Sequence, residues 1–115
     1  GFVLEAIVAD NASAHAFVVG AWTAVQPGDD LAAKAIVFTR NGQESARGTA
    51  SAILGHPLNS LAAAARMGLA QGRPLKRGFV VMAGSAIDPV PVEPGDELGV
   101  CMDGAGCVDV TLAAA

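Results

Sequence analysis

Only one segment of this 115-residue chain repeats apolar residues with the period of an α-helix, and most of the remaining sequence is typical of strands and turns. The apolar stripe consists of Leu58, Leu61, Ala62, Ala65 and Leu69. Pro57 suits the first helical position, where its missing N–H would have no partner, and Gly72 suits the stop. We therefore expect one main helix over residues 57–70, about 21 Å long at ~1.5 Å per residue.

A first hairpin is predicted around the dipeptide Asn41-Gly42. Residues 34–39 (KAIVFT) are rich in β-branched and aromatic side chains, and residues 43–49 alternate small and polar ones. Asn-Gly tolerates positive φ at both central positions of a type I′ turn. The two segments should therefore pair as antiparallel strands.

A second hairpin is predicted near the end of the chain. Leu98, Val100 and Met102 share one face of a strand, and residues 108–112 repeat this alternation with Val, Val and Leu. Residues 103–106 (DGAG) lie between them and are typical of a turn.

Two further apolar runs of strand length, HAFVV at 15–19 and FVVMA at 79–83, are bounded by turn residues. Together the segments predict an α+β fold that is mostly β, a mixed β-sheet roll or sandwich with one main helix. No repeat or linker divides the chain, so residues 1–115 are expected to form a single domain. The chain begins as though inside a strand, which would leave a strand edge and apolar surface uncovered, so we also expect a homo-oligomer or pairing with a missing half.

The composition argues against nucleic-acid and membrane partners. Seven Lys and Arg against eleven Asp and Glu give a net charge of −4, and no basic patch is visible. Hydrophobic residues make up 52% of the chain, but no apolar run approaches the ~20 residues that a membrane helix needs. No signal peptide is evident, so a cytoplasmic location is expected.

The two cysteines, Cys101 and Cys107, flank the predicted second turn and are plausible cross-strand neighbours. They lack the spacing of a zinc site, and in a reducing cytosol both thiols are expected to be free. The three methionines are expected to fill the core. The charged run at 94–97 (PGDE) is expected to be a solvated turn.

Several short motifs, taken in order, carry a resemblance to a known family. They are VADNAS (8–13), FVVG (17–20), TRNG (39–42), LGHPLNSLAAAAR (54–66), AGS (83–85), VPVEPGDEL (90–98) and DGAGCVDV (103–110). Together they resemble the C-terminal half of the 2-oxopent-4-enoate hydratase family, within the fumarylacetoacetate-hydrolase superfamily. The resemblance covers nearly the whole chain, and GHPLN following DNAS at this distance is fairly specific.

The resemblance implies a divalent-metal enzyme, using Mg²⁺ or Mn²⁺, that acts on short 2-oxo or 2-hydroxydienoic acids. The metal would chelate the substrate's carboxylate and 2-oxo oxygen and stabilise the enolate, after which water adds to the activated double bond. In the family three carboxylates hold the metal, two of them in a Glu-x-Glu pair before DNAS. This sequence has no Glu-x-Glu, and Glu5 lies too close to DNAS to be the third ligand. No metal ligand is assigned, and no tight metal site is expected on this chain alone.

The same resemblance implies residues that bind the substrate. The family's AGS-type loop lies against the substrate carboxylate, so Gly84 and Ser85 would offer a backbone N–H and a hydroxyl to an anion. A strand-ending turn would explain the glycine equally well. Asp10, Asn11 and Ser13 could orient substrate or water, which makes Asp10 a catalytic and Ser13 a substrate-binding candidate. Such residues at the foot of a strand are more often turn formers.

His56 is a candidate for two roles. Histidine is a common general acid or base, which would make His56 catalytic. However, a residue before proline is pushed to extended geometry, as an N-cap requires, so His56 could instead mark the entry to the helix. The positive end of the helix could in addition attract an anionic oxo acid.

Two classes of function follow from these residues. The first is a lyase, a hydratase whose close rival is a 4-oxalocrotonate-type decarboxylase on the same scaffold with the same metal. The second is a non-catalytic fragment, which the missing Glu-x-Glu favours for this chain in isolation. The residues upstream of Gly1 would discriminate between the two classes.

Overall fold

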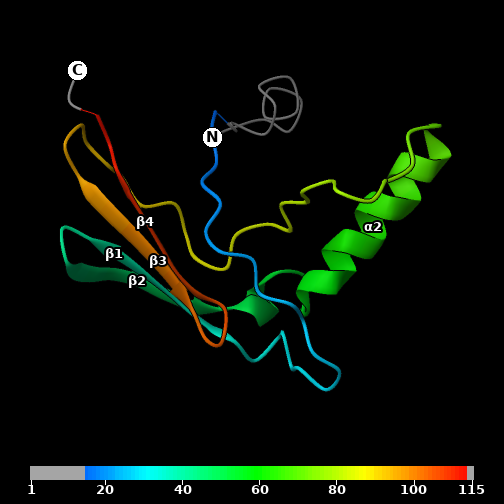
Figure 1. Cartoon of the computed structure of the whole chain (residues 1–115), viewed down its shortest axis with the longest axis horizontal. Coiled ribbons are helices and arrows are strands. Elements are labelled where there is room, and N and C mark those ends of the chain that lie inside the picture. Colours follow the sequence, from blue (N-terminus) through cyan, green and yellow to red (C-terminus); the bar gives the residue numbers. More distant parts are fainter. Residues whose placement is uncertain (1–14, 114–115) are drawn as a thin grey trace.

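The centre of the fold is a small antiparallel sheet. A computed structural model describes residues 15–113 (Figure 1). Its elements are β1 (Ala35–Arg40), β2 (Gln43–Thr49), the 3-10 helix η2 (Ala50–Ala52), α2 (Pro57–Ala70), β3 (Glu97–Met102) and β4 (Gly106–Thr111). The strands lie in the order β2-β1-β3-β4, and each neighbouring pair is antiparallel. The predicted α+β class, mostly β with one main helix, is confirmed in the described part of the chain.

The predicted β1–β2 hairpin is confirmed. Asn41 and Gly42 both have positive φ, 53° and 77°, as the tight turn requires. Asn41 also connects the hairpin to β3. Its backbone N–H donates to the carbonyl of Glu97 at 2.7 Å, and its side-chain oxygen accepts from the Glu97 N–H at 2.9 Å. The turn that closes the hairpin therefore also helps to align β1 with β3.

The predicted β3–β4 hairpin is confirmed too, and the two hairpins share an apolar face. Phe38 pairs with Val100, which pairs with Val108, and all three are half-buried. Gly20 lies on this face, because a Cβ at Gly20 would be 3.2 Å from the Cβ of Val108. Ala50 is the one hydrophobic residue that is fully buried among the described residues. The core of this part of the fold is therefore thin.

Helix α2 has the predicted bounds. His56 is the N-cap: its backbone is extended, with φ −162°, and its Nδ1 accepts from the Leu58 N–H at 3.1 Å. Gly72, with φ 70°, follows the C-cap residue Gln71 and ends the helix. Figure 1 shows α2 standing apart from the sheet. The three leucines of its apolar stripe are exposed, Leu69 by 70%, whereas Ala65 is half-buried.

The strands predicted at 15–19 and 79–83 are not formed, so this expectation is wrong for the described structure. Residues 15–19 form no hydrogen bond with any other described residue, and the Phe79 N–H donates only to the nearby Lys76 carbonyl. A strand needs a neighbour because its backbone N–H and C=O groups require partners. An apolar composition rich in β-branched residues favours a strand, but neither run forms one without a neighbouring strand to pair with.

Two expectations about burial are also wrong. Met67 and Met82 do not fill the core, since they are 62% and 65% exposed, whereas Met102 is half-buried. Conversely, the charged turn at 94–97 is not simply solvated, because Asp96 is only 6% exposed. Met67 lies on α2 and Met82 lies in a run that pairs with no other described segment, whereas Asp96 is held between its own turn and the end of β1.

The buried Asp96 carboxylate joins its own turn, residues 93–96, to Arg40 and Asn41 at the end of β1. Its Oδ2 accepts from the Glu93 N–H at 2.7 Å and from Arg40 Nε at 2.6 Å, and its Oδ1 accepts from Asn41 Nδ2 at 2.8 Å. The hydrogen bond from the Glu93 N–H, followed by those from Asn41 and Arg40, holds the pKa of the Asp96 carboxyl below its usual value. Sequence spacing could not reveal this network, since Asp96 is 56 positions from Arg40.

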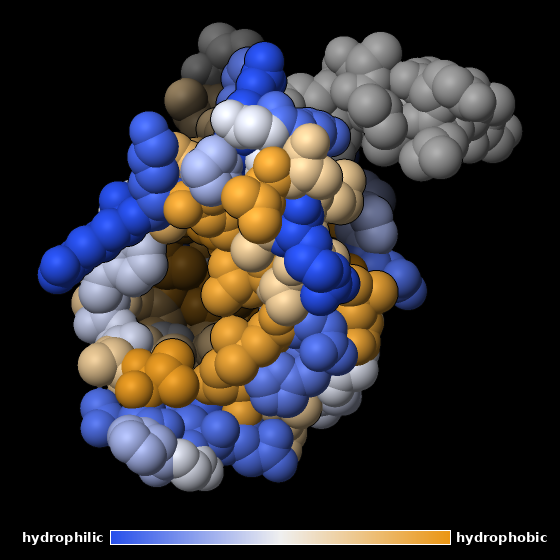
Figure 2. Space-filling model, turned by 90° about the vertical axis from the view of Figure 1, so that its right-hand side faces the viewer, coloured by the Kyte–Doolittle hydropathy of each residue, from blue (hydrophilic) through white to orange (hydrophobic). Residues whose placement is uncertain are grey.

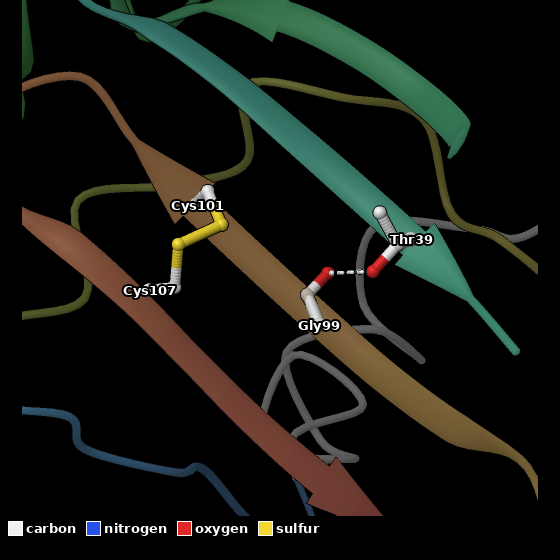
Figure 3. The surroundings of a disulfide bond; sticks show 4 residues. All are labelled: Thr39, Gly99, Cys101 and Cys107. Atoms are coloured by element: carbon white, nitrogen blue, oxygen red, sulfur yellow. Dashed lines mark hydrogen bonds between the residues drawn. A yellow bond between two sulfur atoms is a disulfide. The ribbon is translucent and has the colours of Figure 1, made fainter. Parts of the chain in front are cut away.

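The expectation of two free thiols is wrong as well, because Cys101 and Cys107 form a disulfide. The residues pair directly across β3 and β4, with Cα atoms 4.0 Å apart (Figure 3). The pairing of β3 with β4 brings the two sulfurs together, as the spacing around the turn suggested.

None of the described helices is long and apolar enough to cross a membrane.

Candidate functional site

The AGS motif begins a loop, residues 84–87, whose first two residues are exposed and whose last two are half-buried. The loop is shaped by its own hydrogen bonds. Gly84 has φ 124°, a conformation that side chains rarely allow. The Ser85 hydroxyl donates to the Ile87 carbonyl at 2.6 Å, and the Ile87 N–H approaches the same hydroxyl at 3.4 Å. The hydroxyl proton is therefore engaged within the loop. To donate to a bound anion, Ser85 would have to rotate away from Ile87.

The loop at 84–87 is anchored on both sides by close packing. On β2, a Cβ at Gly48 would overlap the Ala86 carbonyl oxygen and lie 3.1 Å from Ile87 Cγ2. At the other end, a Cβ at Gly84 would be 3.4 Å from Ile53 Cγ2. Only a glycine at 48 lets the loop approach the sheet this closely. The loop is thus held between the end of β2 and the segment that leads into α2.

His56 and Gly84 both lie next to Ile53. The His56 N–H donates to the Ile53 carbonyl at 3.0 Å, and the Ile53 side chain faces Gly84. The Nδ1 of His56 is engaged in the cap of α2, which leaves Nε2 as the ring nitrogen for any proton transfer. The Asn59 side chain braces the same corner by donating to the Leu54 carbonyl at 2.8 Å. The structure therefore shows the capping role of His56, and its catalytic role stays a prediction.

The remaining candidates are not brought together by the described chain. Asp10, Asn11 and Ser13 lie outside the described residues. The larger cavities of residues 15–113, of about 490 Å³, are lined by other segments, one of them by Gly72, Pro74 and Phe79. The loop at 84–87 and the His56 corner lie outside both of these cavities.

A polar hollow on the other face of the sheet was missed by the sequence interpretation. It has a volume of about 320 Å³, and Gly99 is one of the residues that line it. A Cβ at Gly99 would lie 2.6 Å from both Asp109 Oδ1 and Thr39 Oγ1. Glu97 adds a second carboxylate, and Thr39 donates to the Gly99 carbonyl at 3.4 Å (Figure 3). The alternation along β3 and β4 could have placed these residues on one face. Their convergence depends on β1 pairing with β3.

No family model matches the sequence, but individual proteins do. A 4-oxalocrotonate decarboxylase from Pseudomonas sp is 42% identical over 94 residues, which cover 82% of this chain and 36% of the relative. A 2-hydroxyhexa-2,4-dienoate hydratase from Comamonas testosteroni is 36% identical over 107 residues, which cover 93% of this chain and 40% of the relative. The chain therefore spans about two fifths of the length of these relatives.

The solved structure of 4-oxalocrotonate decarboxylase from Pseudomonas putida G7, complexed with magnesium and adipate, matches the fold with a TM-score of 0.85. The match has 36% identity over 93% of this chain and 41% of that chain. This chain belongs to the 2-keto-4-pentenoate hydratase and 4-oxalocrotonate decarboxylase family. The resemblance that the motifs indicated is confirmed. A second structure of the same decarboxylase is complexed with calcium and acetate.

The described residues of this chain do not provide a set of ligands for the divalent metal of those structures. Between residues 15 and 113, no group of three His, Cys, Asp or Glu side chains is placed to hold a metal ion. Glu97 and Asp109 line one hollow, but two carboxylates fall short of the six or more oxygen ligands that hard cations such as Mg²⁺ and Ca²⁺ generally take. The described residues do not fit the metal, and no catalytic step through it is assigned to them.

Proposed function

We propose that this chain supplies the acid-binding part of a divalent-metal-dependent hydratase that adds water to a 2-hydroxy-2,4-dienoate such as the enol of 2-oxopent-4-enoate. The observation that carries the proposal is the anchored loop at 84–87, which lies beside the start of α2. Its support is the match to hydratases and to a decarboxylase complexed with adipate, a dicarboxylic acid. Residues 1–115 would act as one unit of a larger catalytic domain.

The proposed role of the loop is to bind the substrate carboxylate. The positive φ of Gly84 and the absence of a side chain there let a ligand approach the backbone closely. Ser85 is exposed, and its hydroxyl would exchange the Ile87 carbonyl for a carboxylate oxygen, a stronger acceptor. The N-terminus of α2, at Pro57, adds the partial positive charge of the helix dipole beside this loop.

The other candidate residues take supporting roles in the proposal. His56 would hold or move a proton at Nε2 while Nδ1 keeps the helix capped. Asp10 would help to orient or activate water, and Ser13 would add a hydrogen bond to the substrate. These two roles follow from the family resemblance of the DNAS motif.

The complete enzyme would use Mg²⁺ or Mn²⁺ held by carboxylates from polypeptide that this chain does not match. We further propose a cytoplasmic homo-oligomer with no nucleic-acid or membrane partner. The edge strands β2 and β4 have no further strand neighbour among the described residues, which supports self-association. Sedimentation of the purified protein measures the oligomeric state directly.

Two alternatives remain open to experiment. A 4-oxalocrotonate-type decarboxylase is favoured by the 42% identity to such an enzyme and by the fold match. A non-catalytic unit is favoured by the lack of a three-ligand cluster among residues 15–113. Calorimetric titration of the 115-residue chain with Mn²⁺ tests the non-catalytic alternative, because tight binding by this chain alone would exclude a non-catalytic unit.

The hydratase proposal is tested with a polypeptide that joins the unmatched part of a relative to this chain. With Mn²⁺ added, the dienol absorbance of 2-hydroxypenta-2,4-dienoate should decrease as water adds. The same assay with 4-oxalocrotonate, followed by carbon dioxide release, tests the decarboxylase alternative. If the folded protein turns over neither substrate, both the hydratase proposal and the decarboxylase alternative are wrong.

Ser85 offers the sharpest test of the acid-binding loop. Ser85→Ala should raise KM about fivefold, since one hydrogen bond to a charged group contributes about 1 kcal/mol or more, and should leave kcat nearly unchanged. Ser45→Ala, which removes an exposed hydroxyl from β2, is the matched control. Equal KM values for the two variants would contradict a carboxylate contact at Ser85.

A further inference from the structure

Two apolar runs of the chain have the composition of β-strands but no strand partner among the described residues. Residues 15–19 (HAFVV) and 80–83 (VVMA) form no hydrogen bond with any other described residue. Their side chains are largely open to solvent as well, since Phe17, Val18 and Val80 are all exposed. Apolar strands with free backbone groups are templates for pairing with another strand.

The uncovered surface extends beyond these runs to helix α2. Leu58, Leu61 and Leu69 of its apolar stripe are exposed, although an amphipathic helix normally buries such a stripe. Figure 2 shows apolar side chains gathered around a hollow on the side of the molecule that includes α2. Exposed apolar surface on this scale is typical of an interface and not of a monomer surface.

The decarboxylase of the solved structure contains further polypeptide that could cover such a surface. The decarboxylase structure matches 93% of this chain with a TM-score of 0.85, yet about three fifths of that chain lies outside the match. This chain therefore keeps the path of its backbone from a larger fold. The surfaces that are bare in residues 15–113 are the ones against which further polypeptide can pack.

We propose that the runs at 15–19 and 79–83, with Leu58, Leu61 and Leu69 of α2, are the docking surface for the part of the family's domain that this chain does not match. The partner is apolar polypeptide that adds β-strands to the two runs and packs against the helix stripe. This inference rests on the proposed function only in its choice of partner. It concerns assembly and makes no claim about catalysis.

The test is a chimera in which the unmatched three fifths of the Comamonas hydratase is joined to the N-terminus of this chain. Hydrogen exchange is measured on peptides covering 15–19 and 79–83, in the 115-residue chain and in the chimera. The backbone amides should exchange within seconds in the chain alone and at least tenfold more slowly in the chimera, because new strand pairs protect them.

Matched variants show whether the contact lies where the proposal places it. Val18, Val80 and Val92 have similar exposure, 53%, 49% and 42%, so substitution by Lys should affect the isolated chain equally. In the chimera, Val18→Lys and Val80→Lys should lower the unfolding temperature by several degrees more than Val92→Lys, which lies outside the docking surface.

Three outcomes would overturn the proposal. The chimera could fold cooperatively with both runs still unprotected and the three Lys variants alike, or it could fail to unfold cooperatively at all. Alternatively, the isolated chain could protect 79–83 in a concentration-dependent manner, which would make a second copy the occupant. A protected chimera without hydratase or decarboxylase activity would support the docking surface while counting against the proposed function.

Discussion

Gly48 is the residue through which the sheet holds the proposed acid-binding loop, and Gly48→Ala tests this contact. A Cβ at Gly48 would overlap the carbonyl oxygen of Ala86 and lie 3.0 Å from the Ala86 carbonyl carbon and 3.1 Å from Ile87 Cγ2. The first two atoms belong to the backbone, so the clash cannot be relieved by turning a side chain. Either β2 or the loop at 84–87 must move.

Two opposing terms set the size of the effect. Replacing a strand glycine by alanine stabilises the fold by about 0.5–1 kcal/mol, because the unfolded chain loses conformational freedom. Forcing an extra methyl group into a packed contact costs about 1–3 kcal/mol. At the middle of each range the second term is larger, so Gly48→Ala should lower the free energy of unfolding by about 1 kcal/mol.

Urea unfolding of the 115-residue chain, followed by circular dichroism, measures this difference. Gly99→Ala is the matched control. The atoms nearest to its Cβ would be Asp109 Oδ1 and Thr39 Oγ1, both at 2.6 Å, and these side-chain atoms can turn aside more easily than backbone. Its destabilisation should therefore be smaller. If Gly48→Ala unfolds at the same urea concentration as the wild type, or at a higher one than Gly99→Ala, the contact with Ala86 does not anchor the loop.

Other predictions concern the helix cap, the disulfide and the buried carboxylate. His56→Ala should destabilise the chain by about 1 kcal/mol through loss of the N-cap, whereas His56→Asn should restore most of it; equal urea midpoints would contradict the capping role. Thiol titration should find Cys101 and Cys107 unreactive until a reductant is added, and reduction should cost about 2 kcal/mol for so short a loop. Because the pKa of Asp96 is lowered in the folded state, its stabilising contribution should be complete above the ordinary Asp value of ~3.9 and fall as the pH drops through the lowered value. Asp96→Asn should flatten this acid dependence of the urea midpoint, and an unchanged dependence would refute the assignment.

Much of the local structure could be predicted because its causes lie within a few residues. The Asn41-Gly42 dipeptide determines its turn through positive φ at both positions. His56, Pro57 and Gly72 mark the ends of α2 through the geometry that each residue favours. The motifs around 54–66 and 83–85 also indicated the family, since each is a run of neighbouring residues that can be recognised in the sequence.

The candidate site could be predicted only in part. The sequence named Gly84, Ser85 and His56 without showing what holds them, and the structure adds that Gly48 and Ile53 position the loop. The engagement of Ser85 with the Ile87 carbonyl could not be inferred from spacing. A hydroxyl's partner depends on how the loop folds back, which is a property of packing.

The sequence by itself determined the two hairpin turns, the limits of α2 and the membership of the family, because each depends on neighbouring residues or on short motifs. Only the tertiary structure decided that β1 lies beside β3 and that Asp96 is buried against Arg40. It also decided that the runs at 15–19 and 79–83 form no strand pair with the other described residues. These features join groups far apart in the chain or depend on a partner strand, so no local pattern of side chains can specify them.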